Sequence, residues 1–190
     1  MNTYASVWHI VPLPEHSDGL TLSITTVSPY SSMSGRFNQI IYGSEGEINH
    51  YLLTTYGFRL IIGLLVIAIG ILLVFINMIA FRRFSESATL LGISVFFLGS
   101  WITAESRLLQ FFIGDTLFIG SLAYLSLGFL PLAVSIYIKR YLLTTHKKYY
   151  QFYIDLVIFN LFFIFITHVT GWLDYFESII FTHVILIMGI

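Results

Sequence analysis

Two opposite charges, Glu105 and Arg107, stand in the apolar stretch "GSWITAESRLLQFFIGD" (99–115). Ionisable side chains within membrane-spanning segments are rare and mark ion paths, proton relays or signal coupling. Residues two apart on a helix point about 200° away from each other, so we do not expect these two to pair. Each then needs another partner, for example Arg59 for Glu105. In the alternative interpretation, both side chains reach the headgroup layer beside Trp101, an aromatic residue typical of membrane boundaries.

His168 and His183 are further side chains in the apolar segments that could do chemistry. Together with Glu105 they are the candidates for an intramembrane enzyme. Zinc sites, however, show closer ligand pairs such as H-E-x-x-H, and these residues do not have that spacing. The sequence has no recognisable phosphate-binding loop or nucleophile triad either. We therefore expect no metal, no cofactor and no catalytic activity in this chain.

The composition places these residues in a membrane protein. The chain is 57% hydrophobic and 10% charged, whereas soluble domains are about 45–50% apolar and about 25% charged. The net charge of −1 provides no basic field for binding nucleic acid. The absence of cysteine excludes disulfides and thiolate metal sites. The lipid bilayer is therefore the expected partner of most of the surface.

Four long apolar runs predict transmembrane helices, because about 20 apolar residues span a bilayer core. They cover residues 56–81, 88–112, 117–138 and 152–172, and a shorter run predicts part of a fifth helix at 179–190. Residues 51–190 are thus predicted to form a mainly α-helical membrane domain. In the second helix, Glu105 and Arg107 would lie about 26 Å and about 29 Å from its start, near one membrane boundary.

Basic residues set the orientation of these helices, because loops rich in Lys and Arg stay in the cytoplasm. Six of the nine basic residues lie in two loops, namely Arg82, Arg83, Lys139, Arg140, Lys147 and Lys148. We therefore predict a multi-pass protein of the cell membrane with an extracytoplasmic N-terminus.

Residues 1–50 have the character of β-structure. The stretch "LTLSITTVS" (20–28) alternates apolar and hydroxyl side chains, as a half-buried strand does. "VWHIVPL" (7–13) and "FNQIIYG" (37–43) predict two further strands, separated by turn-forming residues. Three strands are too few to close a two-layer core. We interpret this region as the C-terminal strands of an extracellular β-sandwich.

Small residues and a proline shape the predicted packing. Gly63 and Gly70 are seven residues apart, as are Gly92 and Gly99, so each pair shares one helix face. Small residues let membrane helices approach closely, which predicts antiparallel packing of the first two helices along these faces. The alternative is the ordinary abundance of glycine in such helices. Pro131, inside the third run, predicts a kink that is either a signalling hinge or merely structural.

Two polar residues stand in the fourth run. Asp155 is expected either to reach back to Lys147 or Lys148 or to act in signalling. Asn160 lies deeper and is expected to hydrogen-bond another helix. Both are candidates for signalling because polar groups in the membrane are costly.

Several motifs carry a resemblance to one family. "WHIVPLPEHSDGLTLSI", "SPYSSMSG" and "IIYGS" resemble the closing strands of the extracellular jelly roll in the prokaryotic seven-transmembrane receptors with diverse intracellular signalling modules. "WITAESRLLQFFIG", followed by the proline of "LSLGFLPLAVSIYI", resembles the second and third helices of these receptors. The resemblance covers most of the chain.

This resemblance implies a fragment of a bacterial receptor, without the first strands of the jelly roll and the last helices of the bundle. Its ligand would be an extracellular carbohydrate or other small molecule. Its output, a diguanylate cyclase or a histidine kinase, would lie outside this chain, and a homodimer would pair two such outputs. The alternatives are the intramembrane enzyme and a transporter fragment. A transporter predicts repeated or broken helices, of which the Pro131 kink is the one hint.

Overall fold

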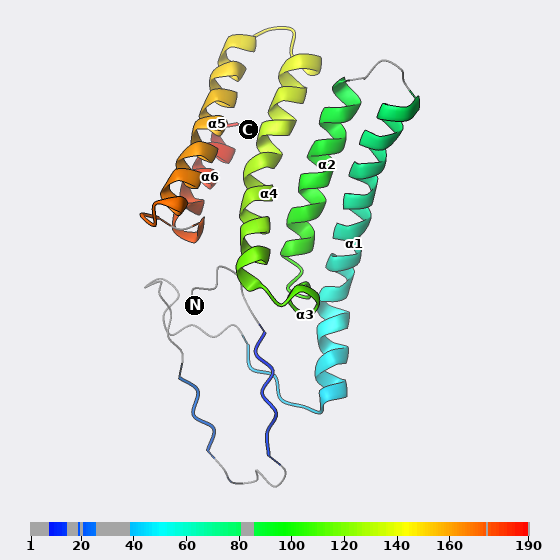
Figure 1. The fold of residues 1–190 in the computed structure, drawn as a ribbon, viewed down its shortest axis with the longest axis vertical. Coiled ribbons are helices and arrows are strands. Elements are labelled where there is room, and N and C mark those ends of the chain that lie inside the picture. The colour runs from blue at the N-terminus through cyan, green and yellow to red at the C-terminus, as the bar shows by residue number, and fades with distance from the viewer. Residues whose placement is uncertain are drawn as a thin grey trace.

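The computed structural model describes residues 8–14, 19, 21–25, 39–80, 86–173 and 175–189. Within these ranges the chain forms a helical bundle (Figure 1). Its elements are α1 (Glu45–Ala80), α2 (Glu86–Ala104), α3 (Gln110–Ile113), α4 (Thr116–Tyr137), the π-helix η2 (Ile138–Leu142), α5 (Lys147–Val169) and α6 (Tyr175–Met188). Among the described residues, four helices are long and apolar enough to cross a membrane: α1, α2, α4 continued by η2, and α5. The predicted mainly α-helical bundle is confirmed, and its four long apolar helices indicate a membrane-embedded chain.

The four long helices lie side by side in the order α1, α2, α4, α5 (Figure 1). Helix α1 packs most extensively against α2, and α2 packs against α4. The short helix α6 contacts both α4 and α5. The turn with α3 lies at the end of the bundle from which the N-terminal segments extend, which we call the junction end (Figure 1). Helix α5 begins at Lys147 at the opposite end.

Helix α1 begins at Glu45, well before the predicted start at residue 56, because a capping box fixes its first turn. The backbone N–H of Ser44 donates to Glu47 Oε2 at 2.8 Å, and the N–H of Glu47 donates to Ser44 Oγ at 3.4 Å. The 36 residues of α1 make a helix about 54 Å long. Since a bilayer core is about 30 Å thick, the first turns of α1 extend beyond the membrane.

The predicted helix over residues 88–112 is interrupted. Helix α2 ends at Ala104, where both the N–H and the hydroxyl of Ser106 donate to Thr103 O, at 3.1 and 2.6 Å. These bonds close a tight turn instead of continuing the α-helical pattern. Asp115 then caps α4, since its side chain accepts from the N–H groups of Leu117 and Phe118.

The β-sandwich predicted for residues 1–50 has no support in the described parts of the three predicted strands. Residues 8–14, 21–25 and 39–43 form no strand, and residues 7, 20, 26–28, 37 and 38 lie outside the described part of the chain. The alternation at 21–25 has no buried face, because Leu22 and Ile24 remain 62% and 48% exposed. Without a partner strand or a covering layer, an alternating pattern does not specify a sheet.

Candidate functional site

Four residues from three segments meet at the junction end of the bundle. The backbone N–H of Trp8 donates to Gln110 Oε1 at 3.2 Å, and Gln110 Nε2 donates to the carbonyl of Trp8 at 3.4 Å. One side-chain amide thus satisfies both backbone groups of Trp8, as a neighbouring strand would. This reciprocal pair joins residues 102 positions apart in the chain.

The ring of Tyr56 on α1 contacts both Trp8 and Arg107. The Trp8 ring meets it edge-on with centroids 5.6 Å apart, and the guanidinium carbon of Arg107 lies 5.8 Å from its centroid. Aromatic pairs contribute about 0.5–1.5 kcal/mol beyond their buried area, and exposed cation–π contacts about 0.5–1 kcal/mol. We call these four residues, Trp8, Tyr56, Arg107 and Gln110, the junction.

Two buried residues hold Arg107 in place. Ser106 is fully buried and Leu108 is 3% exposed, so the turn between α2 and α3 is anchored on both sides of Arg107. Arg107 itself has a positive φ of 61°, a left-handed conformation. That conformation costs a residue with a Cβ roughly 1–2 kcal/mol. The anchors therefore stabilise a strained backbone that directs Arg107 to Tyr56.

Glu105 and Arg107 are both outside the regular helix in which the sequence placed them. Glu105 is exposed and Arg107 contacts Tyr56. Among the described residues, the structure has no ion pair between Glu105 and the suggested partner Arg59, which is also exposed. Of these two charged residues, Arg107 is thus the one that belongs to the junction.

The four described members of the predicted basic set lie at the opposite end, where Arg140 of η2 forms an ion pair with Glu86 of α2. Lys139 bonds to Gln151 Oε1, and Gln151 Nε2 donates to Asp155 Oδ1 at 2.6 Å. Asp155 therefore bonds to a neighbour on its own helix. The structure leaves Lys147 and Lys148 exposed at the start of α5, while Arg82 and Arg83 lie outside the described residues.

The four predicted packing glycines line the contact between α1 and α2. A Cβ on Gly70 would lie 2.6 Å from the backbone N of Phe96, and one on Gly92 would lie 3.0 Å from Gly70 O. A Cβ on Gly99 would lie 2.9 Å from Gly63 O. The two glycine pairs therefore face each other across the antiparallel helices and allow their backbones to approach.

The remaining polar candidates lie apart from the junction. Asn160 on α5 is buried and donates to Thr182 Oγ1 of α6 at 3.1 Å, the interhelical bond that the sequence predicts. His168 stacks on Tyr175 with centroids 3.8 Å apart. His183 Nδ1 lies 2.9 Å from Ile179 O on its own helix.

These contacts give no support to the intramembrane enzyme. The described residues contain no group of three His, Cys, Asp or Glu side chains that could hold a metal ion.

Pro131 lies in the interior of α4 and is half-buried.

Sequence reasoning missed Trp8, Tyr56 and Gln110 as members of one site. Trp8 falls within a predicted strand and Tyr56 at the predicted start of a helix, and no local pattern links either of them to Gln110. The available signal was positional, since Tyr56 and Arg107 both stand at the same predicted membrane boundary as Trp101.

No family model, no curated protein and no solved structure matches this chain. The function is therefore argued from the junction and the bundle.

Proposed function

We propose that this chain is the membrane module of a sensory receptor of the cell membrane, similar to the prokaryotic seven-transmembrane receptors that its sequence resembles. In this proposal the N-terminal segments receive an extracytoplasmic carbohydrate or other small molecule. The helices relay binding to a cytoplasmic output domain outside this chain, a diguanylate cyclase or a histidine kinase, and a homodimer pairs two such outputs.

The reciprocal pair between Trp8 and Gln110 is the observation that carries this proposal. The chain itself links the N-terminal segments to α1, and this pair links them a second time, to the α2–α3 turn. A displacement of Trp8 therefore acts on two helices at once and changes their relative position. A ligand shifts such an equilibrium only if it binds the attached and detached arrangements with different affinity.

Charge supports the orientation in this proposal. Four described basic residues stand at the end opposite the junction: Lys139, Arg140, Lys147 and Lys148. The positive-inside rule assigns that end to the cytoplasm, so the junction end is extracytoplasmic. Within the bundle, Pro131 is the proposed hinge of α4.

The absence of cysteine allows a direct test of the relay. Spin labels are attached at Leu91→Cys, in the second turn of α2, and at Thr144→Cys, two residues after η2, both of which are exposed. The distance between the labels is measured by pulsed EPR in nanodiscs, with and without an antibody fragment raised against the sequence of residues 8–25. We expect the fragment to shift this distance distribution. An unchanged distribution would contradict the relay.

A matched pair of variants identifies the route. Gln110→Ala should abolish the shift, because it removes both bonds to Trp8. Gln39→Ala should retain it, since Gln39 accepts from the Tyr51 hydroxyl at 3.1 Å and is not one of the four junction residues. If Gln110→Ala responds like the parent chain, the junction is not the route of the signal.

A further inference from the structure

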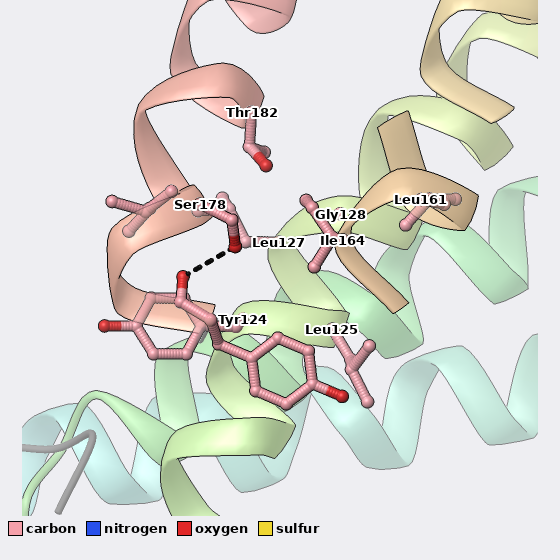
Figure 2. A pocket seen from close by; sticks show the side chains of 10 residues that line it. Tyr124, Leu125, Leu127, Gly128, Leu161, Ile164, Ser178 and Thr182 are labelled. Carbon is pink, nitrogen blue, oxygen red and sulfur yellow. Dashed lines mark hydrogen bonds between the residues drawn. The ribbon is translucent and has the colours of Figure 1, made fainter. Parts of the chain in front are cut away.

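A small cavity lies between α4, α5 and α6 (Figure 2). The cavity volume, counted as the space that the centre of a water molecule can occupy, is about 20 Å³. This volume is enough for one water molecule. Apolar side chains from α4 and α5 form much of its wall, including Leu125, Leu127, Leu161 and Ile164. Ser178 and Thr182 of α6 line the cavity with hydroxyl groups (Figure 2).

The two hydroxyls are one helical turn apart on the same face of α6 and are both buried. Ser178 Oγ donates its hydrogen to the carbonyl of Tyr175 at 3.1 Å, so the lone pairs of this oxygen, which lines the cavity, remain able to accept a hydrogen bond. Thr182 Oγ1 accepts from Asn160 Nδ2 at 3.1 Å, and that bond does not use the hydroxyl hydrogen of Thr182. The cavity therefore offers one donor and one acceptor.

We infer that this cavity is a binding site for a single water molecule, which accepts a hydrogen bond from the Thr182 hydroxyl and donates one to Ser178 Oγ. A cavity in a membrane bundle has no bulk water to solvate these groups, and empty cavities in proteins are lined by apolar atoms alone. This site stands apart from the junction and from the proposed receptor function.

The bound water completes a continuous polar chain through the bundle. It connects Asn160 on α5, through Thr182 and Ser178, to the backbone of Tyr175 in the first turn of α6. Helix α6 has only 14 residues, so its attachment depends on contacts with α4 and α5. Both hydrogen bonds of the water lie within α6, so the water satisfies the polar face of this helix, while the bond from Asn160 to Thr182 attaches that face to α5.

Room for the water depends on Gly128 of α4. A Cβ at Gly128 would lie 2.8 Å from Leu161 Cδ2, the flexible end of a side chain that lines the same cavity. An alanine at this position would displace the Leu161 side chain and so change the shape of the cavity wall. The absence of a side chain at Gly128 is therefore consistent with an occupied cavity.

Hydroxyl-radical footprinting of the whole chain in nanodiscs tests this site. The protein is mixed with H₂¹⁸O and irradiated milliseconds later with a short X-ray pulse. A slowly exchanging internal water still contains ¹⁶O at that time, so the hydroxyl radicals that form from it label neighbouring side chains with ¹⁶O. The reporter is Tyr175, which lines the cavity and is only 6% exposed. We expect ¹⁶O on Tyr175 of the parent chain. The absence of oxidised Tyr175, or ¹⁸O as its label, would overturn the proposal.

Variants of Thr182 distinguish a bound water from other sources of label. Thr182→Val keeps the shape but removes the hydroxyl, and we expect at least a fivefold loss of ¹⁶O on Tyr175. Thr182→Ser keeps the hydroxyl and should retain the label. Ser94→Ala is the matched control, because the Ser94 hydroxyl is also buried, does not line the cavity and donates to Leu90 O of its own helix at 2.8 Å. Equal labelling of Tyr175 in the valine and serine variants would overturn the site.

Discussion

Trp8 and Gln110 hydrogen-bond to each other in both directions across 102 residues of chain. The backbone donor and acceptor of one residue are thereby bound to a single side chain at the start of α3. This pair gives the N-terminal segments a second attachment to the membrane bundle, in addition to the covalent link through α1.

Gln110→Ala should release Trp8 from the α2–α3 turn. The substitution removes two hydrogen bonds, each worth about 0.5–1.5 kcal/mol net, so the pair contributes about 1–3 kcal/mol. Hydrogen exchange of the Trp8 amide should become roughly 5- to 150-fold faster, measured by mass spectrometry or NMR. Gln151→Ala, at the opposite end of the bundle, should leave this amide unchanged. Equal exchange in the parent and Gln110→Ala would show that the pair does not hold the segment.

Trp8→Phe should hold the N-terminal segment at least as tightly as the parent. The indole N–H of Trp8 is buried and has no acceptor among the described residues, which costs about 1–3 kcal/mol. Phenylalanine removes this donor and keeps an aromatic ring against Tyr56, whereas Trp8→Ala loses the ring as well. Amide exchange over residues 9–14 should therefore be unchanged or slower in Trp8→Phe and faster in Trp8→Ala. Faster exchange in both variants would indicate that the indole N–H is needed.

Arg107→Gly should be more stable than Arg107→Ala by about 1 kcal/mol, because only glycine adopts a positive φ without strain. Both variants lose the contact with Tyr56 equally, so the difference isolates the backbone. Thermal unfolding in detergent measures it. His146 has the same φ of 61° at the opposite end, and its glycine and alanine variants should differ in the same direction. Equal stability of the two Arg107 variants would show that the turn relaxes around this residue.

The long helices could be predicted from the sequence because an apolar run of about 20 residues has few alternatives in a bilayer. Their ends could not be predicted equally well. The start of α1 depends on the side chains of Ser44 and Glu47, and the end of α2 depends on the bonds of Ser106 to Thr103. Such local hydrogen bonds override the hydrophobic pattern that places a helix boundary.

The junction was hidden from the sequence for a different reason. Its contacts join segments far apart in the chain, and periodicity reports only on neighbours within a few turns. The alternation at 20–28 was read as a strand because hydrophobic pattern alone does not say whether a partner exists. Asn160 was predictable, because a buried amide in a membrane helix requires a partner and the adjoining helix is the nearest source.

Gly70→Ala and Gly57→Ala should change the stability of the chain in opposite directions. A Cβ at Gly70 would lie 2.6 Å from the backbone of Phe96, which cannot move without separating α1 from α2. Overpacking of this kind costs about 1–3 kcal/mol. A Cβ at Gly57 on the same helix meets nothing within 4 Å, so alanine should stabilise α1 by about 0.5–1 kcal/mol. Thermal unfolding in detergent compares the two, and equal effects would contradict the tight contact at Gly70.

Leu22→Cys should react from outside the cell and Thr144→Cys should not. Both positions are exposed, and they lie on the N-terminal segments and on the loop after η2, at opposite ends of the bundle. The chain has no cysteine of its own, so a membrane-impermeant maleimide reports on each site without background. On intact cells we expect labelling of Leu22→Cys alone, and permeabilised cells should add Thr144→Cys. This expectation follows from the rule that loops rich in Lys and Arg remain in the cytoplasm. The reverse pattern would place the basic end outside and contradict the proposed direction of signalling.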